Sequence, residues 1–246
     1  MRPLRASILF ALILISPASS LLAGEIHEAV TAGNLDRVTE LLRSDPALVR
    51  SPSEAGCAEL PLHLAAMQGQ VEIARLLLQS GADIDGFDRD ESTPLHVAAL
   101  HRKSEMVRFL LDQGADVNRR DKNGAYALSF AISGGDPTAI QMILDAGADL
   151  NHVSPQGGTL LPSACMRGLW DLVDLLLERG VDINQGDRNG TTPMHWVAYR
   201  DDAARVAEML RRGAKASAAD SNGMVPLHAA AERGALGTAK ALLDAG

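Results

Sequence analysis

Glycine residues recur along this chain at one fixed interval, and no other feature constrains its fold as strongly. Each of them follows a leucine-rich segment, as in LLLQSGAD, FLLDQGAD and LLLERGVD. They are Gly81, Gly114, Gly147, Gly180, Gly213 and Gly246, and successive members are 33 residues apart. Such a period is typical of repeat proteins, in which each unit packs mainly on its neighbours. We therefore predict a stack of similar units rather than one central core.

The residues between these glycines predict two short helices in each unit. Thr93 or Thr192 is a good N-cap, and the proline that follows is favoured at the first helical residue, where its missing N–H needs no partner. Leu95, Ala98 and Ala99 then share one face of the first helix. A second set of glycines ends that helix and turns the chain back. These glycines are Gly69, Gly135, Gly168 and Gly234.

A leucine-rich second helix and a turn complete the unit. Segments of the type Asp-x-Asn-Gly, at 121–124 and 187–190, predict hairpin turns between successive units. A 33-residue unit with T-P-L-H-x-A-A, a middle glycine, a leucine triplet and G-A-D-x-N resembles the ankyrin repeat. The resemblance covers residues 24–246.

The resemblance implies an all-α ankyrin-repeat solenoid of about seven repeats, in which helix-turn-helix units are joined by β-hairpin turns. The expected units are 24–57, 58–90, 91–123, 124–156, 157–189, 190–222 and 223–246, the last incomplete. Units four and five depart from the signature, with Tyr126–Ser129 and Thr159–Pro162 in its place. The first unit is also divergent: His27 falls on the signature histidine, and three extra residues precede Leu60.

Residues 1–23 have the layout of a secretory signal peptide. Arg2 and Arg5 precede the apolar stretch ASILFALILI, which is about half the ~20 residues needed to cross a bilayer. Pro17 is expected to break any helix, and cleavage fits after Ser20 or after Ala23. A lipoprotein signal would require cysteine shortly after the leader, where glutamate stands. We expect a periplasmic or secreted protein with no stable membrane anchor after signal cleavage.

Composition and motifs exclude several classes of function. Hydrophobic residues make up 46% of the chain and charged residues 22%, which is enough apolar material for a folded core. The net charge of −8, with no basic run, repels phosphate backbones, so nucleic acid is not an expected partner. Neither a phosphate-binding loop nor a Ser/His/Asp or HExxH motif is present, so we expect no catalytic residue and no cofactor.

Histidines recur at one position of the signature. They are His63, His96, His195 and His228. Zinc requires its ligands about 2 Å from one centre, whereas stacked units separate equivalent positions by about 10 Å. We therefore expect no metal site. The resemblance implies instead that each histidine takes part in hydrogen bonds that tie one repeat to the next.

The two cysteines are not expected to form a disulfide, although export favours such bonds. Cys165 falls on an inward alanine position and is interpreted as a small core residue, whereas Cys57 lies in the loop between units one and two. Three units between them correspond to about 30 Å, far beyond the roughly 7 Å that a disulfide allows between Cα atoms.

Large side chains precede the middle glycine position at the end of most first helices, where the fold does not require them. On the expected concave hairpin-and-helix surface such residues act as interface anchors. The candidates are Met67, Leu100, His101, Met166, Arg167, Trp196, Tyr199, Arg200 and Arg233. For Trp196 and Tyr199 the alternative is packing against adjacent hairpins. Trp170 begins a second helix and is expected to cover the back of unit five.

These features predict a non-catalytic module that binds a protein partner of unknown identity. Two alternative functions remain. One is a secreted effector or immunity-type regulator of an enzyme, and the other is a binder of a small molecule or metal. The last helix carries Leu236, Leu242 and Leu243 with few charges, unlike the polar cap that arrays need. This face predicts a further repeat, end-to-end self-association, or a frayed last unit that is tolerated.

Overall fold

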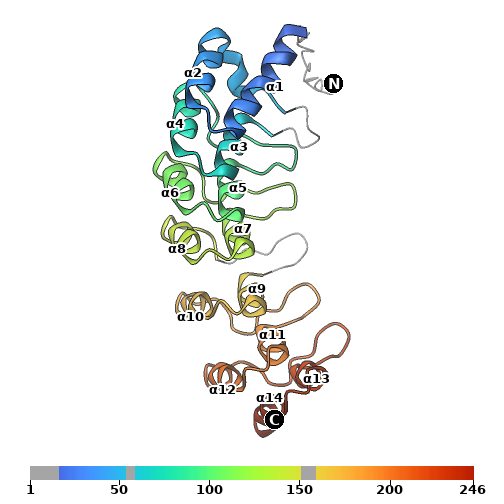
Figure 1. Cartoon of the computed structure of the whole chain (residues 1–246). Coiled ribbons are helices and arrows are strands. Elements are labelled where there is room, and N and C mark those ends of the chain that lie inside the picture. Colours follow the sequence, from blue (N-terminus) through green and yellow to red (C-terminus); the bar gives the residue numbers. More distant parts are fainter. Residues whose placement is uncertain (1–16, 54–58, 151–158) are drawn as a thin grey trace, which may run out of the picture.

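The computed structural model describes residues 17–53, 59–150 and 159–246, with side chains from Leu22 onward. Within these ranges the chain forms fourteen α-helices and one short 3-10 helix, η1 (Pro46–Arg50). The α-helices alternate between two rows that run the length of the molecule (Figure 1). The predicted all-α ankyrin-like solenoid is confirmed, with one helix pair for each of the seven units.

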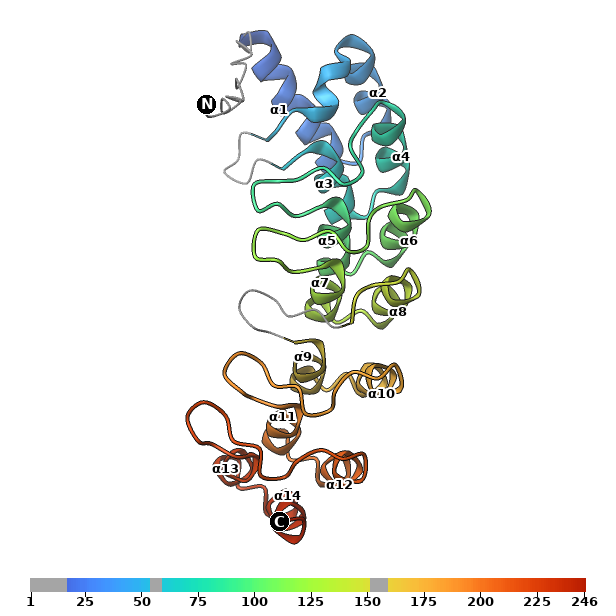
Figure 2. The same cartoon turned by 180° about the vertical axis from the view of Figure 1, so that it is seen from behind.

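The inner row lies next to the long loops that join the units. It contains α1 (Pro17–Thr31), α3 (Pro61–Gln68), α5 (Pro94–Leu100), α7 (Ala127–Gly134), α9 (Leu160–Arg167), α11 (Pro193–Tyr199) and α13 (Pro226–Glu232). Figure 2 shows the loops projecting from this row, away from the outer one. We call the surface of inner helices and loops the inner face; it corresponds to the concave surface expected from the sequence.

The outer row covers the opposite side of the inner helices. It contains α2 (Leu35–Ser44), α4 (Val71–Gln79), α6 (Ser104–Asp112), α8 (Pro137–Asp145), α10 (Trp170–Glu178), α12 (Ala203–Arg211) and α14 (Leu236–Asp244). Between the rows, Leu95, Ala98 and Ala99 are fully buried, as the pattern predicts. The small alanine side chains allow neighbouring inner helices to approach closely, and the leucines of the outer helices fill the space behind them.

Helix α1 begins earlier than the sequence suggests. Pro17 is the first residue of α1, a position that proline favours. The predicted break of a helix in the leader before Pro17 lies outside the described residues and stays a prediction. The helix then continues through Ser20 and Ala23, the two predicted cleavage positions. The boundary of the leader therefore stays a prediction. None of the helices in the described ranges is long and apolar enough to cross a membrane.

The turns that end the helices adopt the left-handed conformation the glycine pattern predicts. Gly69, Gly135, Gly168 and Gly234 end or follow the inner helices with φ between 65° and 78°. Two units lack this glycine, and Arg102 and Asp201 hold the same conformation there, with φ of 59° and 57°. Side chains with a Cβ are strained at such angles, so these two units keep the turn at an energetic cost.

The hairpin turns are present, but their arms are short. In the turn at 121–125, the Asp121 N–H donates to the carbonyl of Ala125 (3.0 Å), and the Asp121 carboxylate accepts the Ala125 N–H (2.7 Å). The Lys122 N–H donates to the carbonyl of Asp90 (3.0 Å) in the neighbouring turn. Over the described stretches the arms form no strand longer than a single bridging residue.

Spacing along the stack is uneven. Helix α7 packs extensively on α5 and only sparsely on α9. Both views show α9 and α10 set apart from α7 and α8. At the end of the stack, α14 has no neighbour beyond it, so Leu236 and Leu243 are 85% and 65% exposed. Leu242, which the sequence pattern placed on this face, is instead buried in the core. The apolar end face therefore consists of Leu236 and Leu243, and what covers it stays a prediction.

Candidate protein-binding surface

The histidine ladder is structural. Each Nε2 atom lies within hydrogen-bond distance of a carbonyl in the next unit: His63 to Ser92 (2.9 Å), His96 to Ala125 (3.2 Å), His195 to Met224 (3.0 Å) and, in the first unit, His27 to Glu59 (3.0 Å). A carbonyl can only accept, so Nε2 carries the proton. These bonds confirm the tie between repeats that the resemblance implies for His63, His96 and His195; among the described residues, His228 bonds only to the Val225 N–H of its own unit.

In His96, His195 and His228 the second nitrogen of the ring caps its own helix, whereas the buried Nδ1 atom of His63 has no partner within the described part of the chain. At His96 the Nδ1 atom accepts the Thr93 N–H at 3.0 Å and lies 2.8 Å from the Thr93 hydroxyl oxygen. A ring bound this way is held neutral, and burial lowers the pKa of His96 and of His63 below the ordinary histidine value. Throughout the described residues, no three His, Cys, Asp or Glu side chains are placed to hold a metal ion.

Two junctions of the stack lack this histidine bond. The equivalent positions in units four and five are Ser129 and Pro162, so neither unit can donate from a ring nitrogen to the next. At the junction of these two units, Arg179 of α10 reaches back to α8, with a long contact to Asp145 (3.7 Å) and one to the Leu144 carbonyl (3.4 Å). Charged contacts at the surface thus replace a buried hydrogen bond.

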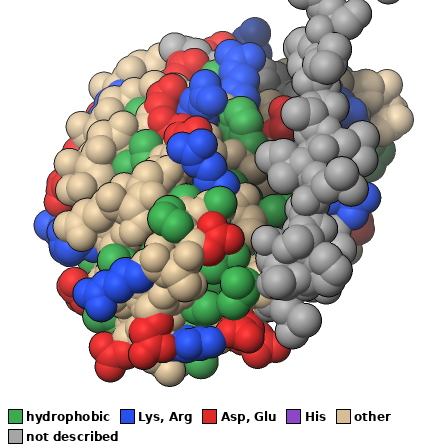
Figure 3. Space-filling model, turned by 90° about the horizontal axis from the view of Figure 1, so that it is seen from above, with side chains coloured by type: hydrophobic (Ala, Val, Ile, Leu, Met, Phe, Trp, Pro, Cys, Tyr) green, Lys and Arg blue, Asp and Glu red, His purple; other side chains and the backbone are tan. Residues whose placement is uncertain are grey.

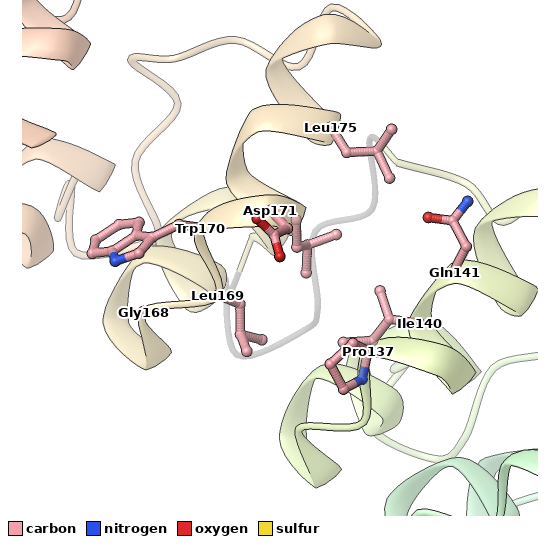
Figure 4. A pocket seen from close by; sticks show the side chains of 9 residues that line it. Pro137, Ile140, Gln141, Gly168, Leu169, Trp170, Asp171 and Leu175 are labelled. Atoms are coloured by element: carbon pink, nitrogen blue, oxygen red, sulfur yellow. The ribbon is translucent and has the colours of Figure 1, made fainter.

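A cleft of about 450 Å³ opens between α8 and α10 at the same junction. Figure 4 shows Pro137 and Ile140 on one side and Leu169 on the other, with Gln141 and Leu175 facing each other across the gap. Most of the lining is apolar, and its polar groups do not converge on a point. The cleft is therefore better described as loose packing between two units than as a site shaped for a ligand.

Cys165 is a core residue, as predicted. Its side chain is fully buried and forms no disulfide, and burial raises the pKa of its thiol to about 12. A thiol in this state is protonated at neutral pH and unreactive. Cys57 lies outside the described residues, so the prediction about its pairing is untested.

The candidate binding residues divide by exposure. Leu100, Met166 and Tyr199 end three inner helices and are 40%, 41% and 38% exposed. His101, Arg167, Arg200 and Arg233 are also exposed at these helix ends, whereas Met67 and Trp196 are half-buried and pack on the core. Trp196 thus fits the packing alternative better than Tyr199 does. The structure places these residues on the inner face without showing what they bind.

Two members of the same surface escaped the sequence analysis. Phe87 and Met224 lie on loops between units, and each is 41% exposed. The guanidinium of Arg119 covers the Phe87 ring at 4.8 Å. The sequence does contain a signal for these two residues, because both are large and apolar in turn segments that otherwise carry polar residues.

Arginine and aromatic side chains interlock in the last three units. The Trp196 and Tyr199 rings meet edge to face with centroids 6.3 Å apart, and the Arg233 guanidinium lies 4.9 Å from the Tyr199 ring. Arg200 donates from Nη1 to the Met166 carbonyl at 3.0 Å. Each of these arginines therefore reaches back to the preceding unit, and Arg200 is partly a structural residue, which the sequence did not predict.

Trp170 lies where α10 begins, between two cations. Arg205 and Arg200 lie 4.9 and 5.8 Å from its ring, and Arg205 also contacts the Asp174 carboxylate at 3.1 Å. In Figure 4 the Trp170 ring points away from Ile140 on the opposite side of the cleft. The expected position in unit five is correct, but the ring fastens α10 to the following unit rather than covering only its own.

Charges at the N-terminal end of the stack are mixed. Figure 3, which looks down on this end, shows acidic and basic side chains interspersed with apolar ones. The ion pair between Arg75 and Glu72 (3.5 Å) is also exposed to solvent. This visible face therefore presents no broad patch of one sign.

Comparison with known proteins decides the family. The model for ankyrin repeats in three copies matches residues 26–121 and 161–246, and a second ankyrin model matches 110–162. The chain belongs to the ankyrin repeat family. Ankyrin repeats generally mediate protein–protein interactions. The histidine ties and turn glycines described above are thus the internal framework of an ankyrin array.

Solved ankyrin structures are similar over most of this chain. The ankyrin repeat domain of Bcl-3, a member of the IkappaB family, superposes with a TM-score of 0.72 at 28% identity, covering 90% of this chain and 96% of that one. The human ASB11 ankyrin repeat domain gives a TM-score of 0.66 at 26% identity, covering 76% and 84%.

One curated relative has a regulatory name. Human protein phosphatase 1 regulatory subunit 27 is 43% identical over 65 residues. That match covers 26% of this chain and 40% of the relative, so it is confined to part of each array.

Proposed function

We propose that this ankyrin array is an exported, non-catalytic module that binds another protein through its inner face, in the periplasm or outside the cell. Membership of the ankyrin family supports protein binding as the general function. The leader at residues 1–23 supports export, since its charged start and short apolar segment fit a signal peptide.

One observation favours the inner face in particular. Among the described residues, the exposed large apolar side chains lie either at the ends of the array or on the inner face. The inner-face set is Phe87, Leu100, Met166, Tyr199 and Met224. The internal outer helices α4, α6, α8, α10 and α12 contribute none. Exposed apolar side chains gathered on one face are typical of protein interaction sites.

Affinity capture tests this proposal. The mature chain is incubated with the periplasmic or extracellular fraction of its source, and captured proteins are identified by mass spectrometry. We expect Met166→Ser with Tyr199→Ala to lose the specific protein, because truncation of an interface anchor typically costs about 2 kcal/mol or more. A matched control changes Gln79→Ala and Arg108→Ala, two exposed residues of outer helices. If the variant Met166→Ser with Tyr199→Ala captures as much of the partner as the control does, binding at the inner face is contradicted.

Export has its own test. N-terminal sequencing of the protein isolated from the source should give a first residue between Leu21 and Gly24. A complete N-terminus on protein found in the cytoplasm would disprove export without affecting the inner face.

A second candidate is regulation of an enzyme by the same surface. It is favoured by the regulatory subunit named above, which shares one stretch of repeats with this chain. If the captured protein is an enzyme, its rate with and without the array distinguishes a regulator from a scaffold.

A further inference from the structure

We propose that the inner face of units five to seven binds an extended acidic segment of its protein partner through a row of three arginines. The row consists of Arg167, Arg200 and Arg233, and the inference rests on the proposed function of this face. Each arginine is the residue before the middle glycine position of its unit, so equivalent positions follow one another at 33-residue intervals. All three side chains are exposed.

The three cations are available for a partner. Within the part of the chain that the structure describes, none of their guanidinium groups pairs with a carboxylate. Arg205 and Arg212, in contrast, both contact Asp174, at 3.1 and 2.9 Å. In a chain with 31 acidic and 23 basic residues, three unpaired arginines in one row are a local departure from the overall charge.

Two members of the row are held in position before any partner binds. The Arg200 guanidinium donates to the Met166 carbonyl and lies so close to Gly168 that a Cβ there would come within 2.6 Å of it. The Arg233 guanidinium lies over the Tyr199 ring, 4.9 Å from its centroid, in the kind of aromatic contact that positions an arginine side chain. Ordering of the arginines before binding reduces the entropy lost when a carboxylate is bound.

Nearby carboxylates are mostly engaged elsewhere. Asp201 accepts the Thr238 hydroxyl at 3.1 Å, and Asp202 accepts the Arg205 N–H at 2.9 Å as the cap of α12. Asp187 and Asp220 accept the N–H groups of their own turns. Glu232 is a free carboxylate beside Arg233 and weakens the end of the row. Screening limits electrostatic interactions to about 8 Å at physiological salt, so the charges beside the row, rather than the net charge of −8, decide what the arginines attract.

The spacing defines the shape of the partner. Neighbouring packed helices are about 8–10 Å apart, so the backbone positions that carry the three arginines repeat at roughly that distance. A polyproline II segment has three residues per turn and rises about 3.1 Å per residue, which places every third side chain on one side about 9 Å apart. Acidic residues at every third position would therefore match the row. Met166 and Tyr199 lie between the arginines and suit apolar residues between the acidic ones.

The two tryptophans of the chain report binding directly. Trp170 contacts Arg200, and Trp196 lies against Tyr199, whose other contact is Arg233. We would titrate the ¹⁵N-labelled chain with a proline-rich peptide carrying glutamate at every third position, and follow both indole N–H signals by NMR. The same peptide with lysine in place of glutamate is the charge control. We expect saturable shifts with the glutamate peptide and none with the lysine peptide.

Matched arginine variants test the row itself. Arg167→Gln with Arg233→Gln should weaken binding of the glutamate peptide about fivefold to tenfold, as expected for the loss of two partly exposed ion pairs. Arg200 is left unchanged because it also supports the fold. The control, Arg43→Gln with Arg108→Gln, removes the same charge from exposed positions of α2 and α6 and should leave the affinity within about twofold.

Equal weakening by both double variants, or equal binding of the two peptides, would overturn the inference. The capture experiment with Met166→Ser and Tyr199→Ala distinguishes failure of this inference from failure of the proposed function. If Met166→Ser with Tyr199→Ala loses the natural partner while Arg167→Gln with Arg233→Gln retains it fully, the acidic segment is wrong and the inner face remains. If neither variant affects capture, the proposed function itself fails.

Discussion

Replacing Arg102 by glycine should stabilise this protein. Arg102 has a φ of 59° at a turn where five other units have glycine. A residue with a Cβ in this conformation costs roughly 1–2 kcal/mol, and glycine offsets about 0.4–1 kcal/mol of that gain by adding freedom to the unfolded chain. We therefore expect Arg102→Gly to increase the free energy of unfolding by about 0.5–1 kcal/mol.

Two variants serve as controls for this calculation. Gly135→Ala makes the opposite change at the equivalent turn of the next unit, where an added Cβ meets no atom within 4 Å, so its cost of about 1 kcal/mol is purely conformational. Asp201→Gly should change stability little, because the relieved strain is offset by loss of the 3.1 Å hydrogen bond from Thr238, worth about 0.5–1.5 kcal/mol.

Urea unfolding followed by circular dichroism measures all three variants, with the m-value checked for a constant extent of unfolding. Arg102 and Gly135 lie in adjacent units, so one transition reports both. Destabilisation by Arg102→Gly, or a neutral Gly135→Ala, would refute the argument from backbone strain.

Three further predictions follow from buried and exposed side chains. Burial lowers the pKa of His63 and His96. Below about pH 6.5 the unfolded chain therefore binds more protons than the folded chain. The stability that these histidines contribute is fully present above that pH, and it should fall as the pH decreases toward the lowered pKa values. His96→Gln should flatten that dependence in urea titrations at several pH values. Cys165, with a thiol pKa of about 12, should react with a thiol reagent only at the rate of unfolding; prompt labelling of this cysteine in native protein would be inconsistent with the burial. Leu176→Ala should cost roughly 2–5 kcal/mol, and Tyr199→Ala much less; equal losses by thermal denaturation would assign Tyr199 to the core.

The features that repeat were predictable from the sequence, because a residue that recurs at one interval must serve the same contact in each unit. The glycines at φ near 70° and the Nε2 bonds of His63, His96 and His195 are of this kind. The exposure of Leu100 and Met166 was equally predictable, since their position in the repeat alone distinguishes them from the buried Ala99 and Cys165.

The features that occur once were not predictable from the repeat. The contact of Arg200 with the Met166 carbonyl depends on where a long flexible side chain comes to rest, which the register does not specify. The left-handed Arg102 contradicts residue preference, because tertiary packing of its neighbours imposes the turn. The start of α1 at Pro17 was missed because proline both breaks and begins helices, and only the surrounding structure selects between these roles.

The absence of histidine at Ser129 and Pro162 bears on how the array comes apart. A linear stack unfolds as one body only while each junction is strong relative to the units it joins. Where α8 and α10 are separated by a cleft and joined by the long Arg179–Asp145 contact, that coupling is weakest. Units one to four and units five to seven should then melt as two blocks, so that heat, denaturant or mechanical force would release the arginine-bearing half while the first four units remain folded.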